Sequence, residues 1–446
     1  MNSLKHREDA DNCLPNFGNN MDYQQELEAI LRKKGIGPEG SKSLGTNDIL
    51  RLPALLLDTS VSLTTQATLL TALLTLDPNK EEREFINLLK ADSAKVIRKE
   101  LHDFITLKGD RFQELINKTI LKKDLSKEEC DEAINTFLDT KTPEFQKGAF
   151  LEAQRLKRES ELENERFFLG LKNAFEPAKI DLPELIDICD SYDGCKRNAP
   201  FSIFTSVVLG SLGYPTITHG AKKIAPKEGL TIHQILAAAG KNPLKTKNEV
   251  CDQLHDHHHR WAYIDQSVFH PLLTSMVEMR KEMVKRPFLA TFEKLLQPIR
   301  AKKNHIVTSY THTHYKNEVM RLLKSIETID GVLHIKGVEG TTMPSLSRSS
   351  TMLVKHASGV SEKETHPSDF AIEEHSTTTN EFSASEVVKM GEDALKGNSS
   401  FALDQIVYQS CTILHHICNL TVKDAKEKVV AIIESGQAWK SWKTAS

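Results

Sequence analysis

The spacing of apolar residues changes once along the chain, near residue 179. Across residues 21–178 apolar residues recur every three or four positions, as in EFINLLKADSAKVIRKELHDFI, without strand-like alternation. Beyond that point short runs rich in β-branched and aromatic residues, such as LPELIDICD, alternate with stretches of helical period. Strands that alternate with helices form a largely parallel sheet covered by helices. The predicted fold class is therefore α/β with an N-terminal all-α domain.

A chain of 446 residues is long enough for two or three domains. We predict a disordered arm over 1–20, a helical extension over 21–110, a helical domain over 111–178 and an α/β domain over 179–446. The segment 358–385 is rich in Ser, Thr and Glu. It predicts either a disordered linker or a hydrophilic hairpin at the edge of the sheet.

A weak internal repeat relates the extension to the helical domain. LLLDTSVSLTTQATLLTALL resembles TFLDTKTPEFQKGAFLEAQRL, so that 57–59 matches 138–140 and, after a gap of one residue, Gln66 matches Gln146. Each copy is followed by a charged segment. A duplication explains this pattern, and so does the ordinary similarity of two amphipathic helix pairs.

Charge and cysteine content exclude several classes of protein. Lys and Arg number 58 against 61 Asp and Glu, so any nucleic-acid surface must be a local patch. Seven cysteines without a CxxC pair indicate reduced thiols in a cytosolic protein. The N-terminus lacks the apolar region of a signal peptide, and the sequence lacks the ~20 apolar residues of a membrane span. We therefore expect a cytoplasmic protein without a membrane partner.

Two loops that follow predicted strands could bind anions. In CDSYDGCKRNAP, Gly194, Lys196 and Arg197 lie between a strand and a helix, where free backbone N–H groups favour a phosphate. In THGAKKIAPKEG, two glycines allow tight turns around a histidine and three lysines. These residues are His219, Gly220, Lys222, Lys223, Lys227 and Gly229. Both loops would gather with HIKGVEG at the carboxyl ends of the strands. The alternative for each is an ordinary solvated loop.

Two further clusters are less specific. MRKEMVKRPF places Arg280, Lys281, Lys285 and Arg286 within two helical turns, which suits either a basic face for anions or a solvated helix face. HDHHHR has two histidines at a spacing of four, but an aspartate follows the first where a zinc protease has glutamate. We expect a helix surface there rather than a metal site.

From about Ile116 onward, roughly three quarters of the chain resembles the anthranilate phosphoribosyltransferases of glycosyltransferase family 3, which share their fold with pyrimidine nucleoside phosphorylases. The segments that carry the resemblance occur in order: KKDLSKEECDEAINTFLDTKTPEFQKGAFLEAQRLKRES, LPELIDICD, TITHG, FHPLL, VKRPF, LLQP and GVLHIKG. The resemblance implies the phosphoribosyltransferase fold.

The catalytic motifs of that family are altered. Where the enzymes have the glycine-rich GTGGD loop around a diphosphate, this chain has 190–194, DSYDG. Pro200 to Ile203 replaces the NxST phosphate grip, and of the paired Asp-Glu that holds magnesium Glu339 remains. Arg286 matches the arginine that faces the aromatic acceptor. These departures imply no catalytic residues and no cofactor.

SYDGCKR, THG and HIKGVEG are instead similar to the divergent YbiB-type branch of the family, which implies a homodimer that binds nucleic acid with little sequence preference. The helices around 137–151 would supply the dimer contact. The resemblance and the loops together predict these phosphate-binding residues: Ser191, Gly194, Lys196, Arg197, His219, Gly220, Lys222, Lys223, Lys227, Lys285 and Arg286.

Three functions stay open at this point. The first is a catalytically degenerate transferase fold that binds single-stranded or unstructured nucleic acid, or another phosphate polyanion. The second is an atypical phosphoribosyl or pentosyl transferase with an aromatic acceptor and magnesium, in which Ser191, Lys196 and Lys222 grip the phosphate. The third is an interaction protein whose N-terminal helices do the work.

Overall fold

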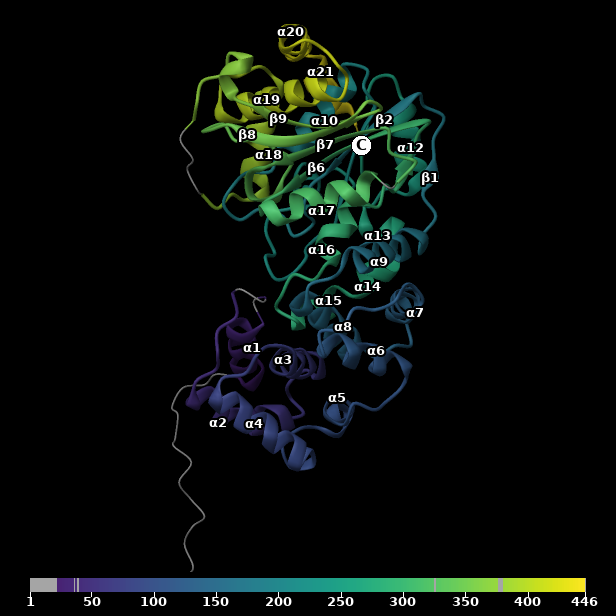
Figure 1. Ribbon diagram of the computed structural model, residues 1–446. Helices are drawn as coiled ribbons and strands as arrows, with labels where there is room; N and C mark the ends of the chain where they lie inside the picture. The colour runs from purple at the N-terminus through teal and green to yellow at the C-terminus, as the bar shows by residue number, and fades with distance from the viewer. Residues whose placement is uncertain (1–21, 36, 38–39, 325, 376–379, 446) are drawn as a thin grey trace, which may run out of the picture.

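The computed structural model describes all residues except 1–21, 36, 38–39, 325, 376–379 and 446. A helical half and an α/β half lie against each other (Figure 1). The arm predicted over 1–20 lies outside the described residues. Among the helices of the described ranges, none is long and apolar enough to cross a membrane.

The helical half confirms the helical period of the N-terminal sequence. Polar N-cap side chains begin most of its longer helices, for example Ser126 before α7 and Ser160 before α9, each in a capping box. The helices are α1 (Tyr23–Lys34), α2 (Thr46–Leu57), α3 (Leu63–Thr75), α4 (Lys80–Ala91), α5 (His102–Thr106), α6 (Arg111–Ile120), α7 (Lys127–Leu138), α8 (Glu144–Lys157) and α9 (Glu161–Asn173).

The α/β half contains the predicted, largely parallel sheet. Its strands are β2 (Glu184–Cys189), β3 (Thr216–Gly220), β4 (Trp261–Asp265), β6 (Lys303–Tyr310), β7 (Gly331–Lys336), β8 (Ser350–His356) and β9 (Gly359–Thr365). The order is β4-β3-β2-β6-β7-β8-β9, and the first five strands are parallel. β8 and β9 pair antiparallel at one edge. The hairpin alternative is therefore correct for the first part of 358–385. A short pair, β1 (Ala178–Lys179) and β5 (Ile299–Arg300), lies apart from this sheet.

Helices cover the sheet on both faces. On one side α10 and the C-terminal helices enclose an apolar core with the strands. The helices of this half are α10 (Ser202–Ser211), α11 (Ile232–Ala238), α12 (Lys247–His255), α17 (Thr313–Lys324), α18 (Ala384–Leu395), α19 (Phe401–His416), α20 (Val422–Glu434) and α21 (Gln437–Thr444). α10 is buried nearly all round, and its buried polar side chains form internal hydrogen bonds, Thr205 to Gln409 and Ser206 to the Ser202 carbonyl oxygen.

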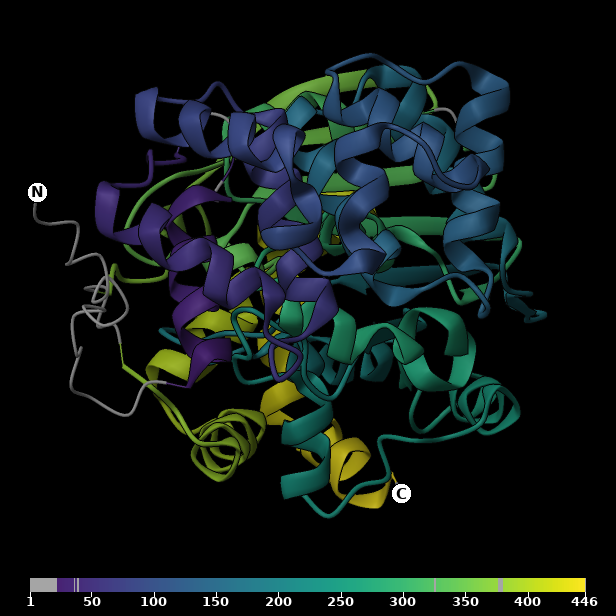
Figure 2. The same cartoon turned by 90° about the horizontal axis from the view of Figure 1, so that it is seen from below.

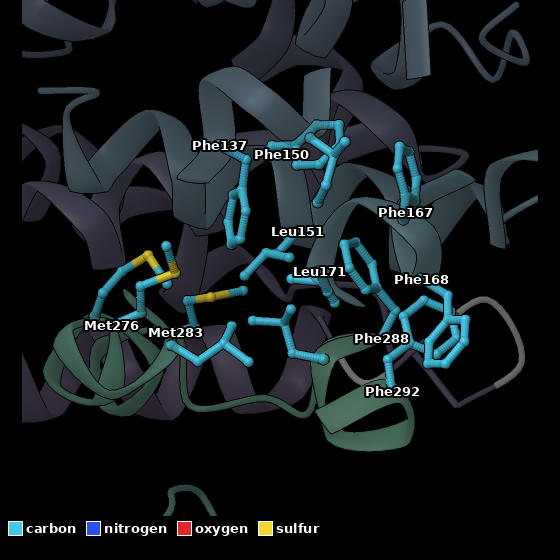
Figure 3. Close-up of a cluster of buried hydrophobic side chains, with 14 of the residues drawn as sticks. Phe137, Phe150, Leu151, Phe167, Phe168, Leu171, Met276, Met283, Phe288 and Phe292 are labelled. Carbon is cyan, nitrogen blue, oxygen red and sulfur yellow. The ribbon is translucent and has the colours of Figure 1, made fainter. Parts of the chain in front are cut away.

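One segment inside the predicted α/β domain packs on the helical half instead. It comprises α13 (Gln266–Phe269), α14 (Pro271–Ser275), α15 (Val277–Glu282) and α16 (Leu289–Phe292). The Phe288 ring stacks on Phe167 with 5.2 Å between centroids and meets Phe150 edge-on (Figure 3). These aromatic contacts belong to an apolar core that continues from the helical half into the α/β half, separate from the core under α10 and the C-terminal helices.

Candidate anion-binding site

The loops that follow β2, β3 and β7 meet at the carboxyl ends of the strands. Cys195 and Leu230 exchange backbone hydrogen bonds of 2.9 and 2.7 Å, which clamp the β2 loop on the β3 loop. Gly194 has φ +70°, and a Cβ atom there would lie 2.5 Å from the Leu230 carbonyl oxygen. A side chain at this position would separate the two loops, so the close approach requires glycine.

Glu339, in the loop after β7, occupies the anion cradle that the β2 loop forms. One carboxylate oxygen accepts from the backbone N–H of Lys196 at 2.8 Å, and the other accepts from that of Arg197 at 2.9 Å. The Asn198 side chain donates at 3.0 Å, and the Lys227 Nζ lies 3.1 Å from the carboxylate. The backbone amides of the β2 loop, where a phosphate was predicted, thus bind a carboxylate of the chain itself.

The electrostatics of the cradle favour this carboxylate strongly. Burial alone raises the pKa of Glu339, but the hydrogen bonds from Lys196 N, Asn198 and Arg197 N, with the charge of Lys227, lower this pKa to about 2. The group is therefore ionised throughout the neutral range. Its backbone has φ +54°, a conformation that residues with side chains rarely adopt.

The loop that carries Glu339 is held from several sides. The Ser191 and Ser309 hydroxyls both donate to the Gly340 carbonyl oxygen, at 2.9 and 2.7 Å. The Thr342 backbone N–H and hydroxyl both donate to one carboxylate oxygen of Asp190. Ser191 therefore contributes to the site by positioning this loop rather than by contacting a phosphate.

Four of the predicted phosphate-binding cations project into solvent. The side chains of Lys196 and Arg197 are exposed above the cradle, and those of Lys222 and Lys223 are exposed on the clamped β3 loop. Lys223 also lies 2.9 Å from Glu228 across the same loop. The structure thus brings both pairs of cations to one edge of the sheet.

Three other predicted residues are engaged inside the protein. His219 is buried, with Nε2 3.0 Å from the Asp187 carboxylate and Nδ1 bonded to the Tyr192 hydroxyl, so neither ring nitrogen is available to an external phosphate. The Lys227 ammonium group pairs with the Glu339 carboxylate and also donates to the Glu339 backbone carbonyl oxygen. Gly220 is buried beside Tyr263. The prediction that His219 and Lys227 are free to bind phosphate is therefore wrong.

Of the four cations in the basic face predicted over 280–286, two are buried and two, Lys281 and Arg286, are exposed. Arg280 is buried and paired with Glu293, while the buried Lys285 donates to the Arg32 carbonyl oxygen at the end of α1. Burial lowers the pKa of Lys285 to about 8. Arg286 is half-exposed, but it lies 2.5 Å from Asp193. These cations join parts of the chain that lie far apart in sequence, which a local sequence pattern cannot reveal.

A cleft between the helical and α/β halves adjoins the three loops. It consists of two neighbouring cavities of about 420 and 340 Å³, which share Arg286, His312 and Tyr315 among their lining residues. Ser191, Asp193 and the buried Lys294 line the first cavity. The sequence interpretation missed Lys294, His312 and Tyr315. Their positions in the sequence could have identified them. His312 and Tyr315 follow β6, near its carboxyl end, and Lys294 lies just after α16.

The structure brings together other possible metal ligands than the two histidines that the sequence suggested. α12 ends at His255, and His259 beyond it contacts Asp256 and Thr444, so the two histidines do not share a helix. Within the described ranges, one group of possible ligands converges, formed by Asp187, Cys189 and His219. Burial, and then the charge of Asp187, raise the pKa of the Cys189 thiol well above its usual value. This thiol is therefore protonated, and internal hydrogen bonds already satisfy the histidine.

Replacing Glu339 by glycine should open the cradle to an external anion. Glycine adopts φ +54° without strain and removes the whole side chain with its carboxylate. We expect calorimetry to detect inorganic phosphate binding to E339G but not to the unmodified chain, and phosphate to raise the melting temperature of E339G. Glu228 has φ +50° in the neighbouring loop, so E228G is the matched control. Equal phosphate binding by E228G would show that the cradle is not the site.

The comparisons with known proteins agree with this architecture. The helical bundle domain of a glycosyl transferase family matches residues 113–170. An uncharacterized protein of Aquifex aeolicus is 27% identical over 226 residues, which cover 50% of this chain and 65% of that protein. YbiB of Escherichia coli is 25% identical over 222 residues, covering 49% and 67%. The matches thus span about two thirds of the length of these relatives.

Enzymes are similar as well. The anthranilate phosphoribosyltransferase of Priestia megaterium is 23% identical over 232 residues, covering 51% of this chain and 64% of the enzyme. The crystal structure of that enzyme from Thermus thermophilus superposes with a TM-score of 0.62 at 16% identity, covering 74% and 97%. The Saccharomyces cerevisiae enzyme in complex with PRPP and Mg gives 0.62 at 15% identity, covering 77% and 98%. The chain therefore has the fold of the anthranilate phosphoribosyltransferases and is similar in sequence both to those enzymes and to YbiB.

Proposed function

We propose that this chain binds single-stranded or unstructured nucleic acid through the exposed side chains of Lys196, Arg197, Lys222 and Lys223, without phosphoribosyl transfer. The observation that carries the proposal is the position of Glu339 in the cradle. The backbone amides that would grip one compact diphosphate are taken by a carboxylate. The cations that remain are long, exposed and flexible, which suits a row of phosphates rather than a single buried one.

The magnesium chemistry of the related enzymes does not fit these residues. A metal-bound diphosphate needs carboxylates that face the leaving group. Glu339 instead faces two amide N–H groups, an amide side chain and an ammonium group, all of which repel a cation. Asp193 also brings a carboxylate to the cleft, where it pairs with Arg286. We therefore expect no magnesium-dependent binding of phosphoribosyl pyrophosphate.

The neighbouring cleft supports the nucleic-acid proposal in a second way. Tyr315 lines both cavities and is 43% exposed, and His312 beside it is exposed. Aromatic faces stack with bases of any sequence, so a strand on the cations could place bases against this wall. Recognition by phosphate charge and stacking predicts little dependence on base sequence.

Changing Lys222 and Lys223 together to alanine tests the proposal. Each lost phosphate contact reduces counterion release, so affinity for single-stranded DNA should fall by roughly tenfold per contact near 0.1 M salt. The slope of log K against log salt should flatten by about one to two. Fluorescence anisotropy at several salt concentrations measures both. The fold should be unaffected, because exposed lysines usually change stability by under ~0.5 kcal/mol.

Lys122 and Lys123 supply the matched control, since they form an exposed lysine pair on the helical half. Their double alanine variant should bind like the unmodified chain. Equal weakening by both double variants would place the nucleic-acid site elsewhere. Micromolar, magnesium-dependent binding of phosphoribosyl pyrophosphate in calorimetry would instead support the transferase alternative.

A further inference from the structure

The helical extension and the helical domain contain two copies of one three-helix unit. The helices α2, α3 and α4 begin at residues 46, 63 and 80, and α7, α8 and α9 begin at 127, 144 and 161, a constant offset of 81. α2 and α7 have the same length of 12 residues. Identical spacing through three helices and two loops exceeds the ordinary similarity of amphipathic helix pairs.

The hydrogen bonds inside the two units repeat with the same offset. The Glu82 carboxylate accepts from the backbone N–H of Leu44 at 2.8 Å and from its own N-cap residue. The Glu163 carboxylate accepts from the backbone N–H of Leu125 at 3.1 Å and from its own N-cap residue. Both carboxylates are fully buried and each pairs with a lysine. The same bonds from carboxylate to backbone therefore brace each copy, although the paired lysines, Lys34 and Lys157, come from non-equivalent positions.

The structure also corrects the alignment of the repeat. The Gln66 side chain donates to the Asp58 carbonyl oxygen at 2.9 Å, and the Lys147 side chain donates to the Asp139 carbonyl oxygen at 2.7 Å. Gln66 thus corresponds to Lys147 and not to Gln146. The gap in the sequence alignment disappears, and of the two explanations for the repeat the duplication accounts for the structure.

The two copies pack on each other through equivalent helices, α3 and α8. Nearly every residue of α3 is buried, although an isolated bundle would leave one face of the helix in solvent. A Cβ atom on Gly148 would lie 2.8 Å from the Thr64 methyl group and 3.4 Å from the Thr68 hydroxyl, so the helices approach closely. Figures 1 and 2 show the first copy alongside the second. Contact between equivalent elements is the arrangement of a two-fold symmetric dimer.

We infer that the extension is a built-in partner, which covers within one chain the face of α8 that a second copy of the helical domain would otherwise cover. The homodimer contact predicted around 137–151 is not available, because Phe137, Phe150 and Leu151 are buried inside the chain. The protein is accordingly a monomer with one set of basic loops. This inference is independent of what those loops bind.

A disulfide between α3 and α8 tests whether the contact lies within one chain. The Thr64 methyl group stands where a cysteine sulfur would stand, within reach of position 148. We expect the T64C/G148C variant to lose two hydrogen atoms, that is two protons and two electrons, to a mild added oxidant, which mass spectrometry measures, and to run at the mass of one chain without reductant. T64C alone, as the control, should not form this bond.

Two outcomes would overturn the inference. A disulfide-linked dimer from T64C/G148C would mean that the extension of one chain covers α8 of another. Because cysteine at position 148 could disturb the packing, light scattering of the unmodified chain provides an independent measurement. It should give the mass of one chain at tens of micromolar, and a dimer mass would contradict the built-in partner.

Discussion

Replacing Glu82 by alanine should lower the free energy of unfolding by about 3–5 kcal/mol, since removing one partner of a buried ion pair leaves the other charge unpaired. Lys34 is buried, and its Nζ lies 2.8 Å from the Glu82 carboxylate. The variant also removes the acceptor for the Leu44 backbone N–H. Urea denaturation followed by circular dichroism measures the loss.

The repeat supplies a matched variant, Glu163→Ala. Lys157 loses its contact with Glu163 but keeps Asp124, at 2.6 Å, so less charge is left uncompensated than in Glu82→Ala. We therefore expect E163A to lower the free energy of unfolding by less than E82A does. Glu84 lies exposed on the same helix as Glu82, and its alanine variant should change stability by under ~0.5 kcal/mol. A loss below about 1 kcal/mol for E82A would contradict the buried brace.

Glu293→Ala should be comparably severe, at about 3–5 kcal/mol, because it isolates a buried guanidinium group. Arg280 donates to both oxygens of Glu293, at 2.7 and 3.1 Å, and both side chains are 1% exposed. Gln266 also loses an acceptor. Thermal and urea unfolding of the purified variant measure the effect.

The double variant Arg280→Met with Glu293→Leu separates charge from packing. Apolar side chains of similar volume often replace a buried pair at little loss, so the double variant should regain most of the stability that E293A loses. The same variant tests the basic face for anions, one of the two interpretations that the sequence pattern left open for Arg280. Nucleic-acid binding should be unchanged in it, and a marked loss would place Arg280 in the binding surface after all.

The sequence by itself determined the elements and the edge at which the site lies. Apolar spacing distinguishes helices from strands, and parallel strands joined by helices must carry their following loops to one edge. The meeting of the β2 loop, the β3 loop and Glu339 follows from that rule. Exposed Lys196, Arg197, Lys222 and Lys223 also lie where the pattern placed them.

Only the tertiary structure decided which of the predicted cations are exposed and which contact other parts of the chain. It also decided which helices of the two copies pack on each other. Lys285 caps α1 from 253 residues away, and Lys227 meets Glu339 from 112 residues away. A lysine has the same local pattern whether it faces solvent, a helix end or a carboxylate, because its partner lies elsewhere in the sequence. The register of the repeat was likewise set by Asp58 and Asp139, whose backbone oxygens accept equivalent bonds from a glutamine and a lysine. A glutamine and a lysine can occupy equivalent positions because the position requires only a hydrogen-bond donor that reaches this carbonyl oxygen.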